Sequence, residues 1–125
     1  DRLIVQTKVN PSQNPQEFRQ KFEQSLRNLR LDYVDLLGIH GINDAETLHQ
    51  TVRPGGCLEL AQQWQAQGKV RFIGFSTHGA TEIITQAIAT DKFDYVNLHW
   101  YYINQVNWEA VVAANRHDMG VFIIS

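Results

Sequence analysis

The distribution of apolar residues along the chain predicts alternating strands and helices. Short runs rich in β-branched and aromatic residues recur along the whole length, and most of them are continuous rather than alternating with polar residues. Continuous apolar runs are typical of strands in a parallel sheet that is covered on both faces. Five such runs are predicted as strands, at residues 3–9, 34–40, 71–77, 94–100 and 120–125.

The segments between these runs carry apolar residues at helical spacing. The first stripe falls at i, i+4, i+8 and i+11 and consists of Phe18, Phe22, Leu26 and Leu29. Pro15 suits the first turn of this helix, and Ser12 or Asn14 is the predicted cap. Further stripes centre on residues 57–64, 83–88 and 108–112. The aromatic residues on these stripes are predicted to be core residues, namely Phe18, Phe22, Trp64 and Trp108.

One connection is longer than the others. Residues 41–56, "GINDAETLHQTVRPGG", contain turn residues, and we expect a loop with about one helical turn there. Loops of this length that follow a strand often carry function.

The repeated order of strand and helix predicts an α/β fold with a parallel sheet. Periodicity alone leaves two architectures open, an open doubly wound sheet and part of an eight-stranded barrel. No strand is followed by G-x-G-x-x-G, so a Rossmann dinucleotide site is not favoured. Both architectures place their chemistry at the carboxyl ends of the strands.

Composition excludes several classes of function. The 125 residues have a formal net charge of −2 with both signs mixed, which favours neither nucleic acid nor an anionic membrane as a partner. No apolar run approaches the roughly 20 residues of a membrane span. The single Cys57 allows no internal disulfide and no thiolate metal cluster, so we expect no bound metal and a reducing, cytoplasmic location.

Both ends of the chain lie inside strand-like runs. We therefore interpret residues 1–125 as a single segment of a larger domain, truncated at both ends.

The predicted strands end in polar side chains that could meet at one rim. These are Lys8, His40, Ser76 with Thr77 and His78, Asn97 with His99, and Ser125. Each has a plain structural alternative: a strand-end histidine bonded to backbone, a solvated lysine, or hydroxyls that cap the next helix. Five polar strand ends directed to one rim nevertheless favour a ligand site.

Several segments resemble the aldo-keto reductase family, whose fold is a (β/α)8 barrel that binds NADPH without a Rossmann motif. "LIVQTKV" resembles the family strand that presents a catalytic lysine, and "LDYVDLLGIHG" resembles its D-Y-V-D-L-Y-L-I-H segment. "GKVRFIGFST" is similar to G-K-V-R-x-I-G-V-S-N, and "FDYVNLHWYYIN" is similar to the strand that follows it. The resemblance implies a partial (β/α)8 TIM barrel comprising roughly strands 3–7.

The resemblance also implies a function and its residues. The implied activity is NAD(P)H-dependent reduction of a small carbonyl substrate, with Lys8 and His40 as catalytic residues. In the family a tyrosine is the acid, an ammonium paired with an aspartate makes it more acidic, and an imidazole orients the carbonyl. Lys8 and His40 match the ammonium and the imidazole, whereas the tyrosine and aspartate would precede residue 1. Cofactor contacts are implied for Ser76, Thr77, Asn97 and Ser125, with either NADP(H) or NAD(H) as the cofactor.

Some residues depart from the family pattern. Thr77 replaces the usual asparagine, Asn97 the usual glutamine, and Ile124 or Ser125 stands where a tyrosine usually stacks on nicotinamide. An alternative is therefore a non-catalytic barrel relative or regulatory subunit that binds nucleotide or a partner without turnover. A third is another barrel enzyme that uses Lys8 as a Schiff-base amine.

Two further expectations concern partners. The motifs H-G-I-N and G-F-S-T-H resemble a microbial branch of this family in which the barrel is followed by a ferredoxin-like module. An iron–sulfur cluster would therefore belong to a domain outside this chain. As an isolated segment, the chain is expected to be inactive and to self-associate through open sheet edges.

Overall fold

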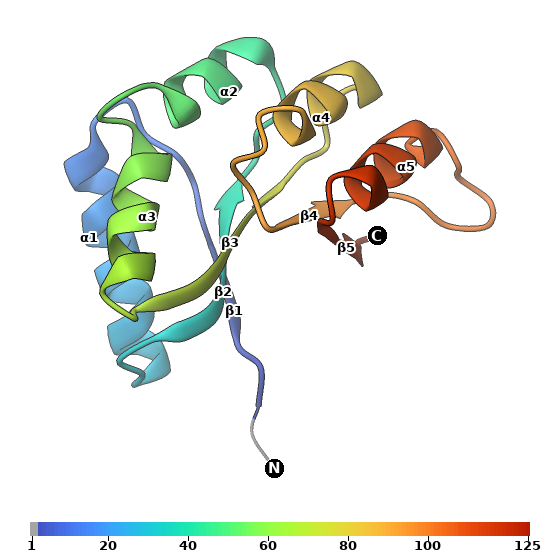
Figure 1. Ribbon diagram of the computed structural model, residues 1–125. Coiled ribbons are helices and arrows are strands. Elements are labelled where there is room, and N and C mark those ends of the chain that lie inside the picture. Colours follow the sequence, from blue (N-terminus) through green and yellow to red (C-terminus); the bar gives the residue numbers. More distant parts are fainter. Residues whose placement is uncertain (1–2) are drawn as a thin grey trace.

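The computed structural model describes residues 3–125, in which strands and helices alternate along the chain (Figure 1). The strands are β1 (Gln6–Val9), β2 (Val34–His40), β3 (Val70–Ser76), β4 (Tyr95–Leu98) and β5 (Gly120–Ile123). The helices are α1 (Pro15–Leu29), α2 (Ala45–Val52), α3 (Cys57–Ala66), α4 (Thr81–Ile88) and α5 (Trp108–Arg116). Each predicted strand is confirmed, with ends that differ by a few residues.

The strand order distinguishes between the two architectures that periodicity left open. The five strands form one parallel sheet in the order β1-β2-β3-β4-β5. A doubly wound sheet reverses its strand order at a switch point, whereas a (β/α)8 barrel adds each strand beside the previous one. The helices lie along one face of the sheet, which is also the barrel arrangement (Figure 1). The fold is therefore α/β, a partial TIM barrel.

The hydrophobic core lies between this face of the sheet and the helices. Alternate residues of the strands, such as Leu37, Ile39 and Phe75, are fully buried in it. Helix α1 contributes Phe18 and Phe22, which stack on Trp64 of α3, and so these aromatic residues are core as predicted. The centroid of the Trp64 ring lies 5.5 Å from that of Phe18 and 4.3 Å from that of Phe22.

The opposite face of the sheet is concave. The Gln6 side chain on β1 donates hydrogen bonds from Nε2 to the Tyr95 hydroxyl at 3.1 Å and to Asn97 Oδ1 at 2.9 Å, both on β4. In a flat sheet these strands would lie roughly 14 Å apart, three spacings of about 4.8 Å. Only a strongly curved sheet lets the side chains meet. This face corresponds to the interior of the barrel.

Glycines make room for a large residue on this concave face. Gly38, Gly74, Tyr95 and Gly120 are successive partners across the strands. A Cβ at Gly74 would lie 2.5 Å from three atoms of the Tyr95 ring, which is itself 2% exposed. One large side chain flanked by residues without side chains fills this layer of the interior.

Two local predictions were wrong. The connection 41–56 contains an eight-residue helix, α2, whose N-cap Asp44 accepts a hydrogen bond from the backbone of Thr47 at 2.7 Å. Trp108 is 50% exposed rather than core, because α5 buries its Ala110 and Ala114 instead. The predicted cap of α1 is confirmed as Asn14, which accepts from the backbone of Gln16 at 3.0 Å.

We expect the isolated 125-residue polypeptide to self-associate. Strands β1 and β5 are the edges of the described sheet, and Phe122 and Ile123 on β5 are 42% and 47% exposed. Unpaired edges beside exposed apolar groups favour pairing between copies. Sedimentation velocity should show a sedimentation coefficient that rises with concentration, and Phe122→Lys should reduce this rise. A concentration-independent monomer that unfolds cooperatively would contradict the expectation.

Candidate active site

Side chains from the carboxyl ends of four strands lie on the concave face. The Lys8 side chain lies beside Gly38, because a Cβ at Gly38 would be 3.0 Å from Lys8 Cγ. His40 follows Gly38 by two residues and therefore points to the same face. Ser76 and Asn97 lie on the same face, because their side chains form hydrogen bonds with those of His40 and Gln6, respectively.

The imidazole of His40 is held by the neighbouring strand. Its Nδ1 lies 2.7 Å from Ser76 Oγ, and the backbone N–H of Gly41 lies 3.4 Å from the same hydroxyl. If Ser76 donates to Nδ1, the neutral ring carries its proton on Nε2. That nitrogen can then donate a hydrogen bond to a ligand oxygen.

The surroundings of His40 favour its neutral form. Partial burial lowers the pKa of His40 below 6.5, and the positive charges of Lys8 and His78 lower this pKa further. This effect of Lys8 agrees with its position beside Gly38, two residues before His40 on the neighbouring strand. The ring is therefore neutral at pH 7 and can act as a hydrogen-bond donor without carrying charge.

The pKa of His40 in the complete protein is expected to be below 6.5, and Lys8→Met should raise it because the repelling charge is lost. An unfolded imidazole has a pKa of about 6.5, so the unfolded state binds more protons below that pH. The contribution of His40 to stability is thus present above about pH 6.5 and is lost as the pH falls. NMR titration of the ring signals measures the pKa, and an unchanged value in Lys8→Met would contradict the proximity.

Thr77 and Ser125 have different positions from the other predicted cofactor residues. Thr77 is 1% exposed, and its hydroxyl accepts from the backbone of Gly79 at 2.9 Å and lies 3.5 Å from Asn43 Oδ1. It does not cap α4, whose N-cap is Ala80 without a side-chain bond. Ser125 is exposed just after β5.

Two more histidines lie just beyond the strand ends. His78 follows Ser76 by two residues and His99 follows Asn97 by two, and Ser76 and Asn97 are partners across β3 and β4. The rings meet, with His99 Nε2 2.7 Å from His78 Nδ1. His78 is exposed and His99 is half-buried.

The Tyr95 side chain lies on the concave face, but the pKa of its phenol does not suit a catalytic acid. Burial raises the pKa of its phenol to about 12, although the bond from Gln6 opposes this shift. A catalytic acid needs a pKa closer to neutrality. Tyr95 therefore serves as an interior packing residue.

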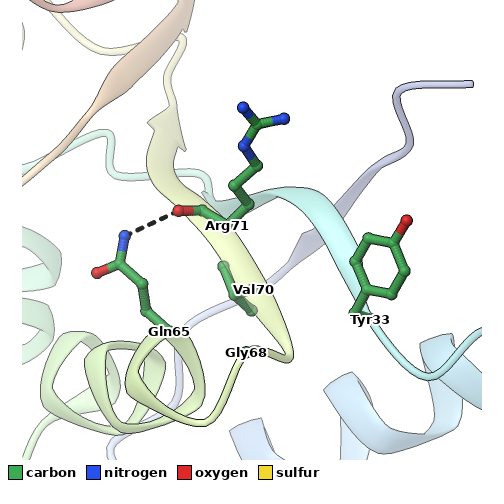
Figure 2. Close-up of a pocket in the computed structure, with 5 residues that line it drawn as sticks. All are labelled: Tyr33, Gln65, Gly68, Val70 and Arg71. Atoms are coloured by element: carbon green, nitrogen blue, oxygen red, sulfur yellow. Dashed lines mark hydrogen bonds between the residues drawn. The ribbon is translucent and has the colours of Figure 1, made fainter. Parts of the chain in front are cut away.

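A surface hollow lies at the opposite end of the strands. It has a volume of about 540 Å³ and is lined by Tyr33, Gln65, Gly68, Val70 and Arg71 (Figure 2). Gln65 donates to the Arg71 backbone carbonyl at 3.0 Å, and the Arg71 guanidinium lies 3.9 Å from Asp35 Oδ1. These contacts stabilise the start of β3, and we place no chemistry in this hollow because barrel enzymes use the other rim.

Possible metal-binding side chains are spread over the described part of the chain. Among residues 3–125, no three histidine, cysteine or acidic side chains come together in a group suited to a metal ion. Cys57 is buried at the start of α3, and its Sγ bonds to the backbone carbonyl of Ser12 at 3.2 Å.

Comparison with known proteins places this arrangement in a family. The model of the aldo/keto reductase family matches residues 1–123. The chain belongs to the aldo/keto reductase family. Dihydrodiol dehydrogenase 3 of Bos taurus is 32% identical over 94 residues, which is 70% of this chain and 26% of that protein.

Solved aldo-keto reductases share the fold. The holo form of an aldo-keto reductase from Bacillus halodurans superimposes with a TM-score of 0.80 and 17% identity, covering 97% of this chain and 42% of that one. A Bombyx mori aldo-keto reductase in complex with NADP gives a TM-score of 0.75 and 20% identity, covering 98% and 41%. The chain thus spans less than half the length of these reductases.

In the part that the structure describes, no helix has both the length and the apolar character needed to cross a bilayer. None of the comparisons supports the iron–sulfur branch in particular, so that expectation stays a prediction.

The prediction considered only the last residues of each strand, and so it missed side chains of the concave face that lie farther from the carboxyl ends. Gln6 and Tyr95 lie two residues before Lys8 and Asn97, respectively, and the period of two along a strand is a signal that could have found them. The contact between His78 and His99 depends on the register of β3 and β4, which the sequence does not reveal.

Proposed function

We propose that the chain is one segment of an NAD(P)H-dependent aldo-keto reductase barrel that reduces a small carbonyl substrate. The observation that supports this most directly is the shared position of Lys8 and His40 on the concave face, at the carboxyl ends of neighbouring strands. A cytoplasmic location is part of the proposal, supported by the single free cysteine.

Each of the two residues has a role that suits its environment. Carbonyl reduction builds negative charge on oxygen, so the site needs an acid and positioned hydrogen-bond donors. The Lys8 ammonium would stabilise the ionised form of a tyrosine acid from another part of the barrel and so lower its pKa. Neutral His40, held by Ser76, would donate from Nε2 to the carbonyl oxygen and orient it.

The residues at the rim suit a nicotinamide cofactor. A carboxamide needs both donors and acceptors, and Ser76 and Asn97 offer hydroxyl and amide groups on the concave face. Thr77 and Ser125 are the other two proposed contacts to the cofactor. Thr77 could make its contact once its hydroxyl moves away from the backbone N–H of Gly79. When bound, NAD(P)H supplies the hydride, and these residues would hold the ring against the substrate.

The test is carbonyl-dependent oxidation of NADPH or NADH by the complete protein. We expect turnover of simple aldehydes, and a His40→Gln variant should lose most of it while still binding nucleotide. Nucleotide binding without any carbonyl reduction across a panel of aldehydes and ketones would reject the proposal.

That outcome would favour a second function, a barrel that binds nucleotide without turnover. The supporting observation is Thr77, whose buried hydroxyl bonds to Gly79 and whose identity departs from the family asparagine. If Thr77→Asn strengthens nucleotide binding but creates no activity, this second function is the better description.

A further inference from the structure

The rim around His40 gathers groups that carry or can accept positive charge. The Lys8 side chain lies beside Gly38 on the strand that carries His40, His78 follows by two residues the Ser76 that bonds to His40, and His99 bonds to His78. The four basic residues among these come from β1, β2 and the segments that follow β3 and β4. A rim of this composition attracts negative charge and repels cations.

The histidine pair lies on the solvent side of the proposed reaction centre. β3 ends at Ser76 and β4 at Leu98, so His78 and His99 lie just beyond the carboxyl ends of these strands, two residues after Ser76 and Asn97. His78 is exposed, and a ligand can reach it. A substrate whose carbonyl contacts His40 would therefore extend toward this pair.

The pairing also determines what the histidines can bind. One of the two facing nitrogens donates to the other, which leaves His78 Nε2 and His99 Nδ1 for other partners. When the pair holds one extra proton, both remaining nitrogens carry N–H groups and the pair has a single positive charge. The two nitrogens of an imidazole point in different directions, so an anion would bind through one of these N–H groups, that of the exposed His78, and the shared positive charge would strengthen the bond to a carboxylate or phosphate.

We propose that His78 and His99 form an anion-binding subsite that selects carbonyl substrates bearing a carboxylate or phosphate group. This inference rests on the proposed reductase function and adds the class of its substrate. The two histidines are specificity-determining residues, and the reduction itself depends on Lys8 and His40.

The experiment uses the complete reductase with two matched aldehydes. The first, 4-carboxybenzaldehyde, is anionic, and the second, methyl 4-formylbenzoate, is neutral and of similar shape. Wild type should prefer the anionic aldehyde in kcat/KM. His78→Gln or His99→Gln should reduce the ratio of the two kcat/KM values by roughly tenfold, mainly through KM, because a charge-assisted bond is lost.

Two further variants separate charge from structure. His78→Lys keeps a positive charge and should retain most of the preference for the anionic aldehyde. If His78 had only a structural role, His78→Lys and His78→Gln should both lose this preference. His49→Gln, at an exposed position on α2, is the matched control and should leave the ratio unchanged.

The outcomes distinguish this inference from the proposed function. Equal kcat/KM values for both aldehydes in wild type, or an unchanged ratio in both glutamine variants, would overturn the subsite alone. A weaker Kd for NADPH with an unchanged ratio would assign the anion to the cofactor phosphates and also overturn it. Absence of NAD(P)H oxidation with every aldehyde would refute the reductase function itself and this inference with it.

Discussion

With the proposed reductase function, replacing Lys8 by methionine is expected to lower kcat of the complete protein by about 100-fold or more, the scale of acid–base catalysis by a positioned group. Methionine keeps much of the length and apolar character of the side chain but removes the ammonium. Without the ammonium, the pKa of the proposed tyrosine acid would rise and proton donation to the carbonyl would slow. Steady-state kinetics with saturating cofactor measures the effect.

Lys21→Met is the control for this change, because Lys21 is exposed on α1, which packs on the face of the sheet remote from the site. It should leave kcat unchanged. The Kd for NADPH should change little in Lys8→Met, because the lysine acts on the acid rather than on the nucleotide. A kcat within a few-fold of wild type in Lys8→Met would rule out the catalytic role of this residue.

Gly74→Ala is expected to have the largest effect on stability. The added methyl group would lie 2.5 Å from the Tyr95 ring, and both residues are buried. Overpacking of this kind costs about 1–3 kcal/mol, and the rigid surroundings of the ring place this case at the upper end. Chemical denaturation should show a lower midpoint with an unchanged slope.

A double-mutant cycle tests whether Tyr95 is the cause. In a Tyr95→Ala background, Gly74→Ala should cost far less, because alanine lacks the three ring atoms that the added methyl group would meet. Gly38→Ala is the matched glycine control and should cost less, since its closest contact is the flexible Lys8 side chain at 3.0 Å. Strictly additive effects of Gly74→Ala and Tyr95→Ala would contradict the explanation.

Most of the fold was predictable because buried parallel strands have a strong local signature. The continuous apolar runs identified all five strands, and the stripe of Phe18 and Phe22 identified α1. Periodicity could not choose between a barrel and a doubly wound sheet, because curvature and strand order come from contacts distant in sequence. The bond from Gln6 to Asn97, 91 residues apart, is such a contact.

Local sequence patterns gave wrong predictions at two places where more than one local structure fits the same residues. The turn residues of segment 41–56 obscured α2, although Asp44 precedes it as a good N-cap. Trp108 fitted an apolar stripe, but small alanines on the same helix pack closer to the sheet.

The candidate site was only partly visible in the sequence. Strand ends pointed to Lys8 and His40, and the structure places both on one face. The hydrogen bond between His40 and Ser76 and the meeting of His78 with His99 depend on strand register, which no single strand encodes. Their catalytic and binding roles stay predictions until the variants are measured.

Asn43 lies in the loop after β2, and its Oδ1 accepts a hydrogen bond from the backbone of His78 at 2.7 Å. A Cβ on Gly79 would collide with the Asn43 backbone, so the two loops touch where no side chain intervenes. We therefore expect the insertion of one residue into the first loop to displace the imidazole on the second. Such an insertion should then change the anion preference proposed for the histidine pair without any change in the strands.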